Sequence, residues 1–145
     1  MGIEVEIKLS PQFEELANGD WSNVIDLALK KSIAEAESIC IREAPVKTGT
    51  LRRSIGSHQS GKNTVYLSGV KYWRHVEYGT GSHTITPKSA KLLHWNDGSG
   101  EHFAKKVFHP GTKANPFVTR TAKKIQSDQV IQRNIIDVLK MKGIV

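Results

Sequence analysis

The sequence predicts an α+β fold, a small and mostly antiparallel sheet packed by one long N-terminal helix and by C-terminal helices. Three observations lead to this prediction. Apolar residues alternate at period two near the N-terminus, and a long stretch with helical spacing follows. Several short strand-like segments with turn residues occupy the middle, before helical spacing returns. The 145 residues suit one domain, 1–145, in which residues 140–145 are expected to form a flexible tail.

The N-terminal part is predicted to contain one strand and the long helix. A half-buried strand is expected from the alternating apolar residues Ile3, Val5, Ile7 and Leu9. A short helix is expected over residues 12–18. The long helix runs from about Trp21, capped by Asp20, to Glu43, because the residue before Pro45 is disfavoured in a helix. Its predicted core stripe comprises Trp21, Ile25, Leu29, Ile33, Ala36 and Cys40.

The central part changes to strand periodicity. Strands are expected at Leu51–Ser57, Thr64–Val70 and Tyr72–Tyr78. A further hairpin is expected to join Lys91–Trp95 to His102–Phe108 through the turn sequence NDGSG.

Helical signals return after residue 114. Asn115 and Pro116 form a cap-and-first-turn signal for one helix, and Ser127 or Asp128 is expected to cap the last one. The buried side of the last helix is expected to comprise Val130, Ile131, Ile135, Val138 and Leu139.

The net charge of +7 is unevenly distributed. Residues 1–41 hold 3 Lys/Arg and 8 Asp/Glu (−5), residues 42–124 hold 15 and 4 (+11), and the rest adds +1. This segregation suits a surface that meets phosphate or an acidic neighbouring protein, although a merely solvated surface explains it equally well. No apolar run approaches the roughly 20 residues that span a membrane, so no membrane contact is expected. The single cysteine, Cys40, fits a reducing cytoplasm.

The stretch HVEYGTGSH brings together His75, Glu77 and His83, which raises the question of a metal site. A second histidine pair, His94 and His102, flanks the predicted hairpin. None of these forms an HExxH or Cys/His pattern, so we predict no metal and no cofactor. The Gly-Thr-Gly turn lacks the lysine and the following helix of a phosphate-binding loop, which makes it a corner that uses positive φ angles.

Catalysis is not expected either. There is no GxSxG sequence, and Cys40 lies on the apolar stripe of the long helix. The carboxylates of the basic middle are widely separated, whereas a magnesium-dependent nuclease needs them clustered. We therefore predict no enzyme activity, with a metal-dependent nuclease at His75, Glu77 and His83 as the enzymatic rival.

A nucleic-acid-binding domain is the leading alternative. Tyr72, Trp73 and Trp95 could stack on bases beside a basic sheet. No helix-turn-helix, zinc finger or RNP-type aromatic run supports a more specific assignment. The basic residues concerned are Arg52, Arg53, Lys71, Arg74, Lys88, Lys91, Lys105 and Lys106.

Three segments in order carry a family resemblance. They are APVKTGTLRRSI at 44–55, YWRHVEYGTGSHTITPKSAKLLHW at 72–95 and HPGTKANPFVTRTAKK at 109–124. Together, over residues 20–125, the chain resembles the minor tail-component and neck (tail-completion) family of lambda-like long-tailed phages, which joins the head to the tail. Lys47 stands where that family often has an acidic residue, so no charge-dependent role transfers to this position.

The resemblance implies a structural virion protein, made in the host cytoplasm, that acts as a ring around the DNA channel. Its implied partners are further copies of itself, head-completion proteins and tail-tube or tail-terminator proteins. Six copies would match the tail tube, and twelve would match the portal. A second hypothesis places Arg52, Arg53 and Lys62 against the backbone of packaged DNA. The remaining interface or fold-motif candidates are Glu77, Tyr78, Gly79, Thr80, Gly81, His109, Pro110, Gly111, Asn115, Pro116 and Phe117.

The motifs also make local predictions. Leu51 is expected to enter the sheet and to leave Arg52 pointing outward. Val76 and Tyr78 are expected to share a buried face, with Glu77 on the opposite face near an arginine. Pro110 and Gly111 should form a tight turn, and Phe117 should anchor the first turn of the following helix in the core.

Overall fold

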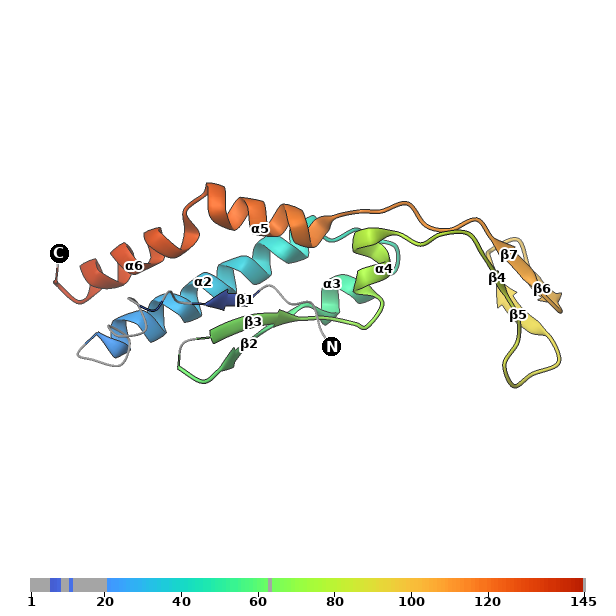
Figure 1. Cartoon of the computed structure of the whole chain (residues 1–145), viewed down its shortest axis with the longest axis horizontal. Coiled ribbons are helices and arrows are strands. Elements are labelled where there is room, and N and C mark those ends of the chain that lie inside the picture. Colours follow the sequence, from blue (N-terminus) through green and yellow to red (C-terminus); the bar gives the residue numbers. More distant parts are fainter. Residues whose placement is uncertain (1–5, 9–10, 12–20, 63, 145) are drawn as a thin grey trace.

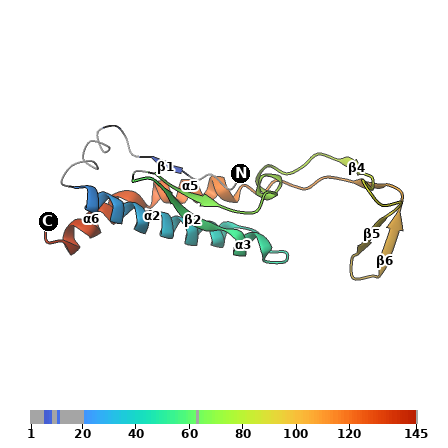
Figure 2. The same cartoon turned by 90° about the horizontal axis from the view of Figure 1, so that it is seen from below.

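The computed structural model describes residues 6–8, 11, 21–62 and 64–144. These residues form an elongated molecule with two parts: a body of helices and a small sheet, and an arm that projects from one end of the body (Figures 1 and 2). Helices and small antiparallel sheets confirm the predicted α+β class. None of the described helices combines the length and the apolar character needed to cross a membrane.

The long helix, α2 (Ser22–Glu43), is the centre of the body. The predicted stripe is confirmed from Ile25 to Cys40, since all of its members in that range are buried. Trp21 departs from the stripe, because it lies just before the helix and is 39% exposed. The predicted cap Asp20 and the predicted helix over 12–18 lie outside the described residues.

Three antiparallel strands form the sheet of the body, in the order β1-β3-β2. The strands are β1 (Glu6–Lys8), β2 (Gly56–Ser60) and β3 (Thr64–Ser68). The central strand buries Val65 and Leu67 completely, as expected for side chains that alternate toward one covered face. Of the predicted N-terminal strand, Ile7 is buried, while its other apolar members lie outside the described residues.

The predicted strand over 51–57 is wrong in its first half. Residues Thr50–Ser54 form a helical turn, α3, and β2 begins only at Gly56. Gly49, with φ of 77°, turns the chain into α3, and the hydroxyl of Ser54 donates to the carbonyl of Leu51. Leu51 is buried as predicted, but from a helix instead of a strand.

The predicted strand over 72–78 is also wrong, because Trp73–Tyr78 form a helix, α4. Trp73 and Glu77 are buried, and their separation of four residues places them on one helical face. Tyr78 is 73% exposed, so it does not share a buried face with Val76. In a run this short, packing against the body decides the conformation more strongly than the pattern of residue types does.

The arm consists of two small antiparallel sheets. In the first, β4 (His83–Ile85) pairs with β7 (Val107–His109). In the second, β5 (Leu93–Asn96) pairs with β6 (Glu101–Ala104), which confirms the predicted hairpin. The predicted strand over 102–108 is divided between β6 and β7, because each half pairs with a different strand.

Two C-terminal helices, α5 (Phe117–Ser127) and α6 (Val130–Met141), pack against α2. Phe117 is completely buried, as its motif predicted. On the predicted buried side of α6, Val130 and Val138 are completely buried, whereas Ile131, Ile135 and Leu139 are only partly buried. The predicted cap at Ser127 or Asp128 is wrong, because Ser127 is still in α5 and Gln129, at φ of 48°, precedes α6.

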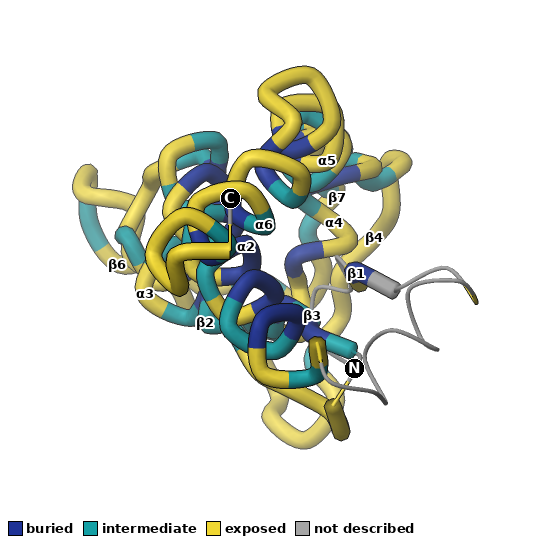
Figure 3. Tube along the Cα trace, turned by 90° about the vertical axis from the view of Figure 1, so that its left-hand side faces the viewer, coloured by how far each residue is buried: buried dark blue, intermediate teal, exposed yellow. Residues whose placement is uncertain are grey.

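The core lies where α2 meets β3 and α5, which is where the buried segments gather in Figure 3. A smaller cluster between α2 and α6 contains Val24, Ala28 and Val138. Cys40 is completely buried in the main cluster, and this burial raises the pKa of its thiol to about 11. Its packing role is therefore as predicted, and its thiol is unreactive at neutral pH.

Candidate functional site

The junction between body and arm is held by the buried carboxylate of Glu77. Its Oε2 accepts from the backbone N–H of Val118 at 2.8 Å, and its Oε1 accepts from the backbone N–H of Thr119 at 3.0 Å. The hydroxyl of Thr119 also donates to Oε1, at 2.6 Å. Glu77 on α4 thus caps the N-terminus of α5, where the chain itself offers only Pro116. The prediction that Glu77 pairs with an arginine is wrong, because its carboxylate bonds Val118 and Thr119 instead.

Two glycines allow the chain to leave and re-enter the body side by side. Thr80 and Thr112 form a bridge in which each backbone N–H donates to the other's carbonyl, at 2.9 and 3.0 Å. Gly79 has φ of 72°, and a Cβ there would lie 2.5 Å from the carbonyl oxygen of Thr112. Gly111 has φ of 95°, and its Cβ would collide with the carbonyl of Thr80. The arm base therefore requires glycine at both positions.

The remaining candidate residues near the arm base include Gly81, His109 and Pro110. Gly81 has no positive φ and its surroundings are open. The predicted tight turn at Pro110 and Gly111 is wrong, because the chain runs on from His109, paired with His83, to Thr112, paired with Thr80. The N–H of Gly111 donates to Nδ1 of His109 at 3.0 Å. The rings of His83 and His109 stack across β4 and β7 with their centroids 5.1 Å apart.

Asn115 plays a part that differs from its predicted role as a helix cap. Its side-chain oxygen accepts from Arg120 at 2.8 Å, and its backbone N–H donates to the carbonyl of Val76 at 2.8 Å. Arg120 also donates to the carboxylate of Glu43 at 2.7 Å, and Lys124 donates to the same carboxylate at 2.5 Å. These bonds tie the end of α2 to the first turns of α5.

The contacts of Glu43 with Arg120 and Lys124 predict that stability depends on pH. The hydrogen bond from Lys124, and then that from Arg120, lowers the pKa of the Glu43 carboxyl below its ordinary value. Its stabilising contribution is therefore complete above the pKa of an unfolded glutamate, about 4.3, and is lost as pH falls through the lower folded-state pKa. Thermal unfolding is measured from pH 7 to pH 3. The wild type is expected to have a higher midpoint temperature than Glu43→Gln at pH 7, and the two midpoints are expected to converge at low pH. A difference that does not change with pH would contradict this.

The three predicted DNA-facing cations do not come together. Arg52 does not point outward: its Nε donates to the carbonyl of Ala44 at 2.8 Å, at the C-terminal end of α2. Arg53 is exposed on α3 and donates to the carbonyl of Thr48 at 3.3 Å. Lys62 is exposed at the turn between β2 and β3, at the other end of that hairpin.

The two histidines of the enzymatic rival lie on different elements, His75 in α4 and His83 in β4. Glu77 is engaged with α5, and the described residues contain no group of three His, Cys, Asp or Glu side chains placed to hold a metal. His94 stacks on Phe103 with ring centroids 4.6 Å apart, and His102 contacts Asp97 at 3.0 Å. The two hairpin histidines therefore contact different neighbours.

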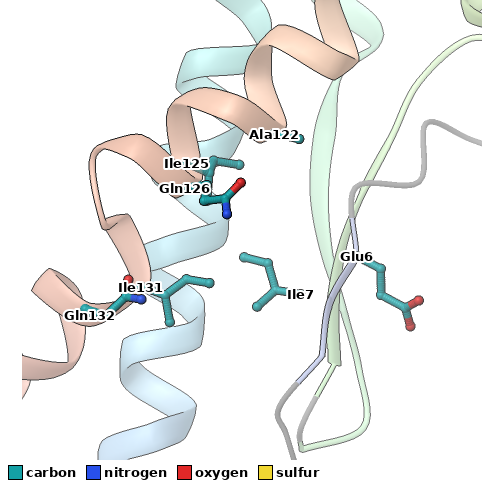
Figure 4. A pocket seen from close by; sticks show the side chains of 7 residues that line it. All are labelled: Glu6, Ile7, Ala122, Ile125, Gln126, Ile131 and Gln132. Atoms are coloured by element: carbon teal, nitrogen blue, oxygen red, sulfur yellow. The ribbon is translucent and has the colours of Figure 1, made fainter.

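Two hollows on the body are large enough to consider as binding sites. One, of about 330 Å³, lies between β1 and helices α5 and α6, where Ile7, Ile125 and Ile131 approach one another (Figure 4). Glu6 points away from these isoleucines, so the described residues that line this hollow bring no reactive groups together. The other, of about 320 Å³, lies beside the arm base and is lined by Pro45, Val46, Lys47, Thr48, Gly49, Leu51, Tyr72 and Val76.

The sequence did not predict how exposed the arm is. Residues 78–116 include no buried residue, although the arm carries several large apolar side chains. Their alternation with polar residues was visible in the sequence, but it is equally typical of a sheet with one covered face. Within the two sheets of the arm, Phe108 and Phe103 are the most exposed of them, and Ile85 and Trp95 are exposed as well, as is Leu92 just before β5.

Together, the fold and this junction define an α+β domain with a projecting arm that contains no buried residue. The two chain segments at the base of the arm pair through Thr80 and Thr112, and this pairing requires glycine at positions 79 and 111. A family model described as "Bacteriophage HK97-gp10, putative tail-component" matches residues 7–79, which are 73 of the 145 residues. The chain belongs to this HK97-gp10-like family of phage tail components. The match runs from β1 to Gly79, where the arm begins.

The family match confirms the resemblance to phage tail components that the sequence motifs carry, and a tail component is part of the virion. The match covers the first motif, at 44–55, and the start of the second, whereas residues 80–95 of the second motif and the third motif, at 109–124, lie beyond it. No curated protein matches the chain, and no solved structure does either.

Proposed function

We propose that the chain is a structural subunit of the head–tail connection of a lambda-like long-tailed phage and forms a ring around the DNA channel. Family membership supports a tail component, and the arm is the observation that carries the ring. A closed ring needs a head-to-tail interface between two different surfaces of one subunit. An elongated subunit with a body at one end and an exposed apolar arm at the other offers two such surfaces.

Six copies would match a tail tube, with twelve as the alternative that matches a portal. The ring would stack between head-completion proteins and tail-tube or tail-terminator proteins. The subunit would act without catalysis, metal or cofactor. Its contacts with DNA would involve the exposed Arg53 and Lys62, since Arg52 is engaged with the end of α2.

Native mass spectrometry of the purified chain over a range of concentrations tests the ring. The expected result is a closed oligomer of six or twelve subunits that becomes dominant as concentration rises. A chain that remains monomeric at every concentration, and that is monomeric in complete virions, would contradict the proposal.

The alternative, a nucleic-acid-binding domain, is supported by the basic character of the middle of the chain. The structure places Lys88, Lys91, Lys105 and Lys106 in the arm and Trp73 in the core, so the predicted basic sheet with adjacent aromatics is not assembled as one surface. A gel-shift assay with the monomer at moderate salt discriminates the two. Tight binding favours the alternative, and its absence favours the connector.

A further inference from the structure

The tip of the arm presents an acidic and aromatic face. Register in the β5–β6 hairpin pairs His94 with Phe103 and Asn96 with Glu101, which places Phe103 and Glu101 on the same face of the ribbon. Phe103 is 61% exposed, and the side chain of Glu101 is 64% exposed. Asp97, in the turn, is held ionised because hydrogen bonds from Ser99 lower its pKa. Glu101 and Asp97 are the only acidic residues between residues 80 and 115.

Among the described residues, no residue of this tip is buried against the rest of the chain. A two-stranded ribbon is at best marginally stable in water unless its apolar face packs against something else. The β5–β6 hairpin forms its own two-stranded sheet, and no residue from 78 to 116 is buried. An exposed aromatic residue on a ribbon without a core is a feature of surfaces that become covered on assembly.

A complementary surface lies on the body beside the arm base. The hollow of about 320 Å³ between the α2–α3 loop and α4 is apolar over most of its lining, with Val46 59% exposed and Tyr72 42% exposed. Lys47 lines it, and the exposed Lys71 stands next to Tyr72. We call this hollow, lined by Pro45, Val46, Lys47, Leu51, Tyr72 and Val76, the basal groove. Its charge is opposite to that of the arm tip.

We propose that the arm tip of one subunit docks in the basal groove of the next subunit of the ring, with Phe103 in the groove and Glu101 beside Lys47. The occupant is a second copy because the groove lies where the arm begins, whereas the tip is at the far end of the same arm (Figures 1 and 2). Tip and groove are different surfaces, as a head-to-tail ring requires. This inference rests on the proposed ring and names the contact that closes it.

Disulfide trapping tests the contact directly. The full chain carrying Phe103→Cys is mixed with the full chain carrying Val46→Cys under oxidised glutathione, and a disulfide-linked dimer of the two variants is expected. The native Cys40 will not interfere, because it is buried and its thiol pKa is about 11. In the matched control, Phe108→Cys takes the place of Phe103→Cys. Phe108 is 67% exposed on β7 and lies outside the tip. Equal trapping with Phe108→Cys, or none with Phe103→Cys, would overturn the proposal.

A charge exchange provides the second readout. Glu101→Lys and Lys47→Glu are each expected to raise the concentration needed for assembly about tenfold, and the double variant is expected to restore much of the loss. Both residues are exposed, so folding of the body should not change. Single variants that assemble like wild type into intact rings would overturn the contact and leave the ring standing. A wild-type chain that never assembles would overturn the ring and the contact together.

Discussion

Replacing Glu77 with alanine is expected to lower the free energy of unfolding by about 3 kcal/mol. The carboxylate accepts hydrogen bonds from the second and third N–H groups of α5, and each bond to a charged group contributes about 1.5–3 kcal/mol. Since Glu77 is only 2% exposed, water cannot readily replace it. Urea unfolding followed by tryptophan fluorescence measures the change, because Trp73 is buried on the same helix.

Two variants make this result specific. Glu77→Gln keeps the shape and one acceptor oxygen, so it is expected to lose roughly half as much stability. Glu101→Ala removes an exposed carboxylate and is expected to stay within about 0.5 kcal/mol of wild type in the monomer. If Glu77→Ala unfolds at the same urea concentration as Glu101→Ala, the capping role of Glu77 is wrong.

The second large effect is expected at the base of the arm. Gly79→Ala places a side chain at φ of 72° and ψ of −176°, a conformation that costs other residues about 1–3 kcal/mol. The new Cβ would also lie 2.5 Å from the carbonyl oxygen of Thr112 and 2.8 Å from the nitrogen of Ala114. To relieve this clash, the paired segments at the arm base must separate.

Hydrogen exchange detects that separation locally. The amides of Thr80 and Thr112, which bond each other's carbonyls, are expected to lose protection in Gly79→Ala, while amides in the middle of α2 keep theirs. Gly81→Ala is the matched control two residues away, because Gly81 has no positive φ and open surroundings. Equal protection of Thr80 and Thr112 in the two variants would show that the pairing of these two residues does not depend on Gly79.

The sequence predicted those elements whose signals are local. The helical stripe of α2, the tip hairpin with its NDGSG turn and the burial of Phe117 all follow from spacing and turn chemistry within a few residues. The corner at Gly79 was likewise predictable, since glycine adopts a positive φ more readily than other residues, but the other glycine of the Gly-Thr-Gly sequence, Gly81, does not adopt one.

The failures concern contacts between distant residues. Glu77 caps a helix that begins 40 residues later, and Arg52 bonds the end of α2 from α3, so neither partner can be identified from neighbouring residues. The same applies to α4, where packing of Trp73 and Glu77 against the body selects a helix over the predicted strand. Alternation in the arm could not show whether its apolar side chains are covered within the chain.

The central claim is that copies of this tail component join head to tail into a ring through the arm. Cryo-electron microscopy of the assembled full-length chain tests this most directly. We expect a closed ring in which the arm tip of each subunit lies on the body of its neighbour, next to α3 and α4. A two-fold dimer, or a ring whose arms contact no neighbouring subunit, would contradict the account.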